Sequence, residues 1–201
     1  FKISATNVTD GYYEGLKLLN RVGQHENSRN GEVLAAPGPV LTEFVNPEYR
    51  VLNSALRDAN PFFHVMEAIW MLAGRNDSAF VSRFVQRMNT FVDGDSGVLN
   101  GAYGHRWRKF FNFDQILEAS TMLREYPESR RVVISMWSAD DLNFRSKDIP
   151  CNTHIYFRVV NNMLDMTVCN RSNDIYWGLF GANAVHLSIL HEVMAESTGY
   201  R

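Results

Sequence analysis

The stretch THIYFRVVNNMLDMTVCN, residues 153–170, decides the fold class. Its two halves alternate along the chain and are rich in strand-forming residues, and Asn161-Asn162 stands between them. Two asparagines tolerate the positive φ angles of a type I′ turn, so the pattern predicts a β-hairpin. A two-residue turn fixes which residues face each other. It sets Arg158 opposite Asp165, an opposite-charge pair that contributes roughly 0.2–1 kcal/mol.

Extending the same register beyond the hairpin places Cys151 opposite Ser172, with Arg171 beside them. A neighbouring guanidinium favours the thiolate, which is the nucleophilic form of cysteine. Cys151 is therefore a candidate nucleophile, and the alternative is a small structural residue at the start of a strand. Cys169 lies within the second strand and is expected to be structural.

The other segments predict helices and further strands around this hairpin. Apolar spacing, start signals and stop signals predict helices over residues 9–23, 61–74, 113–126 and 183–197. Residues 61–74 are apolar on nearly every side, so we expect that helix to be buried. Residues 132–136 predict a central strand, and 33–52 predict irregular strands broken by proline and glycine. The fold class is α+β, with a mainly antiparallel twisted sheet covered by helices.

Composition indicates one compact domain over residues 1–201, because 45% of the chain is apolar. The net charge of −2 argues against duplex nucleic acid as a partner. No apolar run reaches the length of a membrane span. Two cysteines outside any C-x-x-C motif indicate reduced thiols in the cytoplasm. The chain starts at Phe1 without a methionine, so we expect a piece of a longer protein.

A carboxylate within an apolar helix and several arginines are candidates for catalysis and for ligand binding. Glu67 lies within the apolar helix over 61–74, where a carboxylate either serves as a general acid or base or reaches an exposed edge. The guanidiniums of Arg29, Arg130, Arg131 and Arg171, with the Ser172 hydroxyl, suggest a single phosphate site, although each alone suits a solvated surface. Metal binding is not expected, because His64 and Glu67 have no third ligand at suitable spacing.

Five segments, in this order, resemble the thymidylate synthase and deoxycytidylate hydroxymethylase family. The segments are EAIWMLAGRND at 67–77, NGAYGHRW at 100–107, PESRRVVISMW at 127–137, IPCN at 149–152 and RSNDIYWG at 171–178. The resemblance implies the family's fold with a sheet-mediated homodimer. It also implies one-carbon transfer from 5,10-methylenetetrahydrofolate to C5 of a pyrimidine deoxynucleotide monophosphate. The family's chain continues further, so the resemblance implies that its C-terminal portion is missing here.

The resemblance also implies roles for individual residues. Cys151 would add to C6 of the pyrimidine, Glu67 would manage protons at position 4 of the base, and Tyr103 would assist loss of the C5 proton. Phosphate would be held by Arg29, Arg171 and Ser172 of one subunit. Arg130 and Arg131 would reach the site of the neighbouring subunit. Asp174 and Asn183 look like the residues that contact the base.

Departures from the family pattern bear on product and substrate. Asn152 replaces the histidine that usually follows the nucleophile, and residues 89–92 carry none of the family's two tryptophans. A less shielded intermediate would be captured by water, which favours a hydroxymethyl product over a methyl product. Asn183 can donate to O4 and accept from N3–H, which favours deoxyuridylate over deoxycytidylate.

Three alternatives remain at this point. The first is a thymidylate synthase that forms a methyl product. The second is a relative that binds nucleotide without turnover, which the missing tryptophans suggest. The third is a cysteine hydrolase that pairs Cys151 with His154 or His186, although no oxyanion-hole pattern accompanies these residues.

Overall fold

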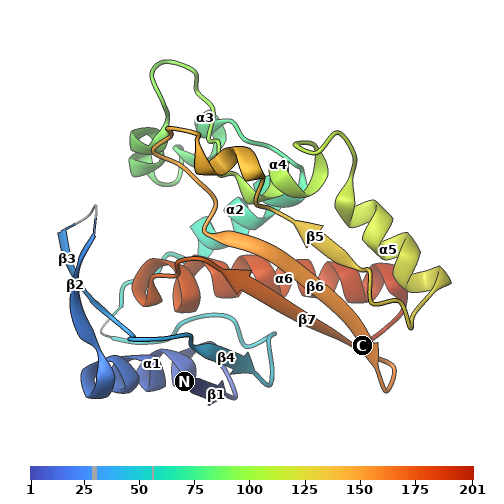
Figure 1. Cartoon of the computed structure of the whole chain (residues 1–201), viewed down its shortest axis with the longest axis horizontal. Helices are drawn as coiled ribbons and strands as arrows, with labels where there is room; N and C mark the ends of the chain where they lie inside the picture. Colours follow the sequence, from blue (N-terminus) through green and yellow to red (C-terminus); the bar gives the residue numbers. More distant parts are fainter. Residues whose placement is uncertain (29–30, 56) are drawn as a thin grey trace. The chain divides into compact units, whose positions relative to one another are not determined.

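The computed structural model describes residues 1–28, 31–55 and 57–201. They form two compact units that interleave along the chain (Figure 1). The first unit comprises Phe1–Asn60 and Asp174–Ser188, and the second comprises Pro61–Asn173 and Ile189–Arg201. The expectation of a single domain over 1–201 stays a prediction. Within the described residues, no helix is both long and apolar enough to cross a membrane.

The first unit packs a helix against a short parallel strand pair. Its elements are β1 (Lys2–Ala5), α1 (Val8–Val22), β2 (Gln24–Ser28), β3 (Gly31–Ala35), β4 (Leu41–Phe44) and the π-helix η3 (Ile175–Ala182). β1 pairs with β4 in parallel, and β2 pairs with β3 as an antiparallel hairpin. Asn7 caps α1 by accepting the amide of Asp10 at 2.9 Å, which satisfies one donor of the first helical turn.

The aromatic ring of Phe180 fills the centre of this first unit. It is fully buried, and it lies edge-on to Tyr12 and Phe44. A Cβ atom at Gly11 or at Gly15 would lie 2.7 Å from a ring carbon of Phe180. The two glycines of α1 therefore leave the space that the ring occupies.

The second unit is built on an antiparallel sheet of three strands in the order β5-β6-β7. The strands are β5 (Val133–Ser135), β6 (Asn152–Val160) and β7 (Met163–Asn170). The helices are α2 (Pro61–Leu72), α3 (Ser78–Val81), η1 (Gln86–Phe91), α4 (Tyr103–Arg108), α5 (Gln115–Glu125), η2 (Ala139–Leu142) and the last turns of α6 (Asn183–Thr198). α4 and α5 pack on β5, and His191 of α6 hydrogen-bonds the Leu164 carbonyl of β7.

The predicted hairpin is confirmed. Asn161 and Asn162 have φ angles of 51° and 63°, as a type I′ turn requires, and Arg158 pairs with Asp165. The predicted helices are also present over 61–72, 115–125 and 183–198, and the first runs over 8–22. Gly74 and Gly199, each with positive φ, follow α2 and α6 as expected of helix stops.

The predicted register is wrong beyond His154, because β6 contains a β-bulge. His154 pairs with Cys169, but the next pair is Asn152 with Asn170, so Thr153 is an extra residue. The Thr153 carbonyl accepts hydrogen bonds from the amides of both Met136 and Trp137, at 2.9 and 3.2 Å. Cys151 consequently faces Arg171 and not Ser172, and the Arg171 amide donates to the Cys151 carbonyl at 3.0 Å.

The expectation that α2 is buried on all sides is wrong for one face. Phe63, Ala68, Trp70 and Met71 are buried, whereas Phe62, Val65 and Ile69 are 82%, 45% and 52% exposed. These three positions are spaced three and four residues apart, so they share one side of the helix. The apolar run therefore contains a buried face and an exposed apolar face, and composition alone does not separate them.

A buried ion pair links α4 to η2 within the second unit. Both guanidinium nitrogens of Arg106 contact the Asp141 carboxylate, at 2.7 and 2.8 Å, and each side chain is less than 5% exposed. Arg106 also donates to the carbonyls of Asn100 and Met136 and lies over the ring of Phe110. These partners satisfy most of its donors, as a buried guanidinium requires.

Candidate active site

Cys151 lies at the base of β6, where the bulge ends the regular ladder. It is a free, half-buried cysteine. Bulges often redirect a side chain next to a functional site, and this one sets the Cys151 backbone directly against Arg171. The neighbouring Asn152 is fully buried, and its amide contacts the Asn170 side chain.

Tyr103, the first residue of α4, meets Cys151 in the structure. Burial raises the pKa of the Tyr103 phenol, and the nearby Cys151 and Asp148 raise it further. Hydrogen bonds from the backbone of Cys151 and Asn152 act in the opposite direction on this pKa. A neutral hydroxyl is thus held beside the thiol, where it can accept or pass on a proton.

Glu67 lies on α2, which packs on α4, the helix that begins with Tyr103. Gly104 follows Tyr103 and lies against the backbone of Met71, and Glu67 stands one turn before Met71. A Cβ atom at Gly104 would lie 1.8 Å from the Met71 carbonyl oxygen, so only glycine permits this approach. Glu67 is half-buried, and one of its carboxylate oxygens is buried.

Arg171 holds the chain that leads into Cys151. Its Nε donates to the Pro150 carbonyl at 2.9 Å, and Nη2 donates to the Ile149 carbonyl at 3.2 Å. The guanidinium also lies 5.3 Å from the centre of the Trp137 ring. Its side chain is exposed, and so is that of Ser172. A cation and a hydroxyl are thus available to an anion beside the cysteine.

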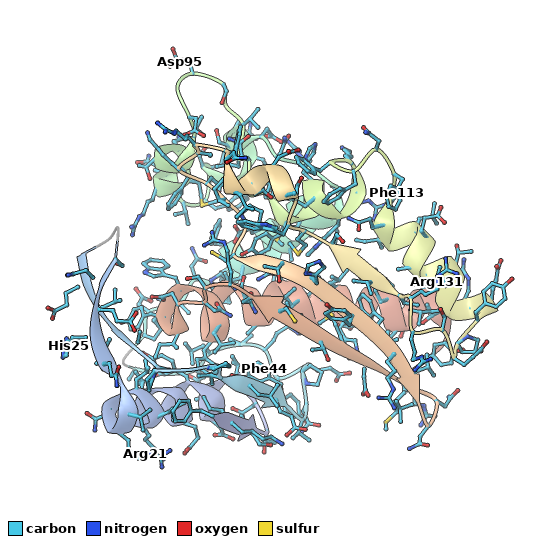
Figure 2. The ribbon with its side chains drawn as sticks, in the orientation of Figure 1. Arg21, His25, Phe44, Asp95, Phe113 and Arg131 are labelled. Carbon is cyan, nitrogen blue, oxygen red and sulfur yellow. The ribbon has the colours of Figure 1, made fainter. Side chains whose placement is uncertain are left out.

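Arg130 and Arg131 lie at the other end of the sheet. Both are exposed, and Figure 2 shows Arg131 near the start of β5. Val133 pairs with Tyr156, so Arg131 and Cys151 are separated by about seven strand positions. At the rise of a β-strand this is a distance of roughly 20 Å. The chain therefore does not bring these two arginines to its own cysteine.

The two residues expected to contact a base belong to the first unit. Asp174 precedes η3 and caps it, since its carboxylate accepts the amides of Tyr176 and Trp177 at 2.8 and 2.6 Å. Asn183 is buried at the start of α6, where its backbone N–H donates to the Gly178 carbonyl. Both are therefore helix-end residues. Arg29 lies outside the described residues.

Two residues near the cysteine were not identified from the sequence. Trp137 stacks with Arg171, and Asp148 lies close enough to affect Tyr103. Trp137 falls within a segment quoted for the family resemblance, so it could have been proposed. Asp148 carries no sequence signal of its own, because Tyr103, the residue whose pKa it affects, lies 45 positions earlier in the chain.

The fold is α+β, and a cysteine faces an arginine at the base of its antiparallel hairpin. This arrangement is the one expected of an enzyme that uses a cysteine nucleophile beside an anion site. Comparison with known proteins identifies its family. The family model described as thymidylate synthase matches residues 17–201. The chain belongs to the thymidylate synthase family.

Two similar relatives share one description within this family. Deoxyuridylate hydroxymethyltransferase of Pseudomonas phage M6 is 50% identical over 199 residues, which are 98% of this chain and 56% of that protein. The enzyme of the same description from Bacillus phage SP01 is 37% identical, over 85% of this chain and 49% of that protein. The chain spans about half the length of these curated relatives.

A solved structure supports the fold. Thermostable thymidylate synthase A from Bacillus subtilis matches with a TM-score of 0.61 and 24% identity, over 72% of this chain and 54% of that chain. The predicted α+β fold of thymidylate synthase type is thereby confirmed, while the homodimer stays a prediction.

Proposed function

We propose that this protein is a deoxyuridylate hydroxymethyltransferase, which adds a one-carbon unit to C5 of deoxyuridylate. The 50% identity to the Pseudomonas phage M6 protein of that description, over nearly the whole chain, carries the proposal. The thymidylate synthase alternative has weaker support, since Buchnera aphidicola thymidylate synthase is 29% identical over 92% of this chain. We place the protein in the cytoplasm, where its two free cysteines stay reduced.

Cys151 is the proposed nucleophile. Its thiolate adds to C6 of the pyrimidine, and the electron pair of the C5–C6 bond makes C5 nucleophilic. After C5 has gained its carbon substituent, its proton must leave, and the thiolate then departs from C6. Tyr103 is proposed to relay that proton, because its hydroxyl lies beside Cys151 and can accept the proton from C5 while it releases its own to water.

Substrate phosphate is the proposed ligand of Arg171, which faces Cys151, and of Ser172, which follows Arg171 in the chain; both are exposed. A guanidinium can bind two phosphate oxygens at once. Arg29 is proposed to join them. We propose that Arg130 and Arg131 serve the site of a second subunit in a homodimer, because the strand register sets them far from their own cysteine.

Asn183 and Asp174 are the proposed contacts to the base. An asparagine amide donates and accepts at once, which matches O4 and N3–H of uracil. Glu67 is proposed to manage protons at position 4. It is half-buried, and one of its carboxylate oxygens is buried.

Methylenetetrahydrofolate, when bound, supplies one carbon at the oxidation level of formaldehyde. The residues that would cover it include the 3₁₀ helix Gln86–Phe91, none of whose residues is buried and whose single aromatic is Phe91. One half-buried phenylalanine ring would cover a flat ligand less completely than two tryptophans. Water that reaches the C5 substituent would replace the cofactor nitrogen on that carbon, and this supports the proposal of a hydroxymethyl product.

Product mass tests the proposal. The full-length protein is incubated with methylenetetrahydrofolate and either deoxyuridylate or deoxycytidylate, and the nucleotide is analysed by mass spectrometry. We expect the hydroxymethyl product from deoxyuridylate. A methyl product would identify a thymidylate synthase, and turnover of deoxycytidylate would overturn the choice of base. Nucleotide binding without any product would identify a non-catalytic relative.

A further inference from the structure

A carboxylate joins the two segments that carry Cys151 and Tyr103. Asp148 lies three residues before Cys151, and Gly101 lies two residues before Tyr103. The Gly101 amide donates to the Asp148 carboxylate at 2.7 Å. Hydrogen bonds to a charged acceptor are shorter and stronger than neutral ones, so this contact is a firm connection between the segments.

Further hydrogen bonds reinforce the same connection. The Ser146 hydroxyl accepts the Asp148 amide at 3.0 Å and the Asn100 side-chain amide at 3.1 Å. Asp93 accepts the Lys147 amide and the Asn100 side chain, both at 3.1 Å. The Asn100–Ser146 and Lys147–Asp93 contacts link residues 93–101 to residues 146–148, and the other two contacts lie within one segment each. The segment before Tyr103 and the segment before Cys151 thus form one network.

The carboxylate of Asp148 also occupies space that a side chain would otherwise take. A Cβ atom at Gly101 would lie 2.7 Å from one Asp148 oxygen, and Gly101 is buried. A larger residue at position 101 would therefore require the Asp148 carboxylate to shift. Asp148 and Gly101 are complementary residues that meet from distant parts of the sequence.

We propose that Asp148 is a positioning residue that holds the Tyr103 hydroxyl against the Cys151 thiol by binding the Gly101 amide. This inference rests on the proposed function, in which these two groups act on C6 and C5 of the base. Asp148 acts through Tyr103 and Cys151. Its negative charge near the phenol also raises the Tyr103 pKa and so helps keep the hydroxyl protonated.

The experiment compares Asp148→Ala and Asp148→Asn with a matched control, Asp95→Asn. Asp95 is exposed, and Figure 2 shows it at the tip of a loop. Turnover is followed as tritium release from deoxyuridylate labelled at C5. The alkylation rate of Cys151 by iodoacetamide is measured by peptide mass spectrometry, and this measurement needs neither nucleotide nor folate.

We expect Asp148→Ala to lower kcat by roughly 10- to 100-fold, because a small misplacement of reacting groups has effects of that size. The KM for deoxyuridylate should stay within about twofold, since Asp148 belongs to the positioning network and not to the phosphate site. Asp148→Asn keeps an acceptor oxygen for the Gly101 amide and should recover most of kcat. Asp95→Asn should match the wild-type protein.

A double-mutant cycle shows whether Asp148 acts through Tyr103. In a Tyr103→Phe background, Asp148→Ala should change kcat by less than about threefold, because coupled residues are not additive. The alkylation rate of Cys151 should rise about threefold or more in Asp148→Ala, since the segment before the cysteine loses its anchor. Wild-type kcat and alkylation rate in Asp148→Ala, or an undiminished effect on kcat in the Tyr103→Phe background, would overturn the proposal. Should the wild-type protein release no tritium, the proposed function fails, and alkylation alone decides the role of Asp148.

Discussion

Cys151 and Cys169 are 18 positions apart and differ in their neighbours. Cys151 is half-buried beside Tyr103 and Arg171, whereas Cys169 is exposed within the regular ladder opposite His154. We predict that Cys151→Ser lowers tritium release from C5-labelled deoxyuridylate by at least roughly 1,000-fold, because a serine hydroxyl is a far weaker nucleophile. The nucleotide Kd, measured by calorimetry, should change by less than about threefold.

Cys169→Ser is the matched control for this change. It makes the same sulfur-to-oxygen change at the other cysteine, in β7, and leaves Cys151 in place. Turnover should therefore stay within about twofold of wild type. Loss of activity in Cys169→Ser with retention in Cys151→Ser would reverse the assignment of the nucleophile.

Asp141 provides a prediction about stability and pH. Burial raises the pKa of this carboxyl, but the hydrogen bonds from Arg106 and from the Ser138 amide, with the positive charges of Arg106 and Arg171, together hold the pKa below its usual range. A lowered folded-state pKa gives stability that is full above the unfolded-state value of about 3.9 and is lost as pH falls through the folded-state value. The wild-type protein should therefore lose this stabilisation below about pH 4.

Removing the charge leaves Arg106 buried without its counterion. We predict that Asp141→Asn lowers the free energy of unfolding by about 3–5 kcal/mol near pH 7, measured by urea denaturation. Its stability should also change less than that of wild type between pH 5 and 3. An unchanged midpoint in urea would show that Arg106 finds other partners.

Among single elements, α4 owes its position to a glycine. Gly104 lets α4 approach the backbone of α2 at Met71, which sets Tyr103 and Glu67 on neighbouring helices. We predict that Gly104→Ala lowers the free energy of unfolding by about 3 kcal/mol or more, because the obstructing atoms are backbone and cannot rotate away. Thermal unfolding measures the loss, and tritium release should fall in parallel.

Gly38→Ala is the control for this substitution. A Cβ atom at Gly38 would meet only Phe1, at 3.8 Å, which is an ordinary contact distance. Its melting temperature should match that of wild type. Equal effects of the two substitutions would mean that loss of glycine flexibility, and not the contact with Met71, is responsible.

Local patterns made most of the long elements predictable. The β6–β7 hairpin follows from the asparagine pair at its turn, and α2, α5 and α6 follow from spacing and end signals. The six residues of α4 are too few for a helical period. The pairing of β1 with β4 joins residues about 40 positions apart, and no local signal indicates such a parallel pair.

The candidate site was predictable where a residue carries its own signal. Cys151 and Arg171 stood out through residue type and position at the hairpin base. The bulge at Thr153 did not, because strict alternation cannot show an extra residue in one strand. Asp148 was missed because its role arises only when Gly101 is packed beside it.

For the whole molecule, the strand register separates the arginines into two groups. Arg171 accompanies Cys151, while Arg130 and Arg131 lie at the far end of β5 and β6. If the proposed homodimer shares these residues, an inactive Cys151→Ser protein and an inactive Arg130→Ala/Arg131→Ala protein should complement each other. Each mixed dimer then contains one intact site, as symmetry of the shared contact requires.

An equal mixture of the two variants measures this sharing. Random exchange makes half of the dimers mixed, so tritium release should recover to about one quarter of the wild-type rate. The control is the Cys151→Ser protein alone, taken through the same exchange procedure, and it should stay inactive. Mixtures without recovery, after exchange has been verified by mass spectrometry, would place Arg130 and Arg131 outside the shared site.

The bulge at Thr153 has a consequence for how such proteins diverge. From His154 onward, the hairpin follows one register, whereas Cys151 and Arg171 follow another. Evolution can therefore rewrite the alternating pattern of the outer hairpin, for instance to suit a new neighbour, while the cysteine and its facing arginine keep their alignment. Because of the extra residue Thr153, substitutions in the outer hairpin can change the surface available for assembly without changing the pairing of Cys151 with Arg171.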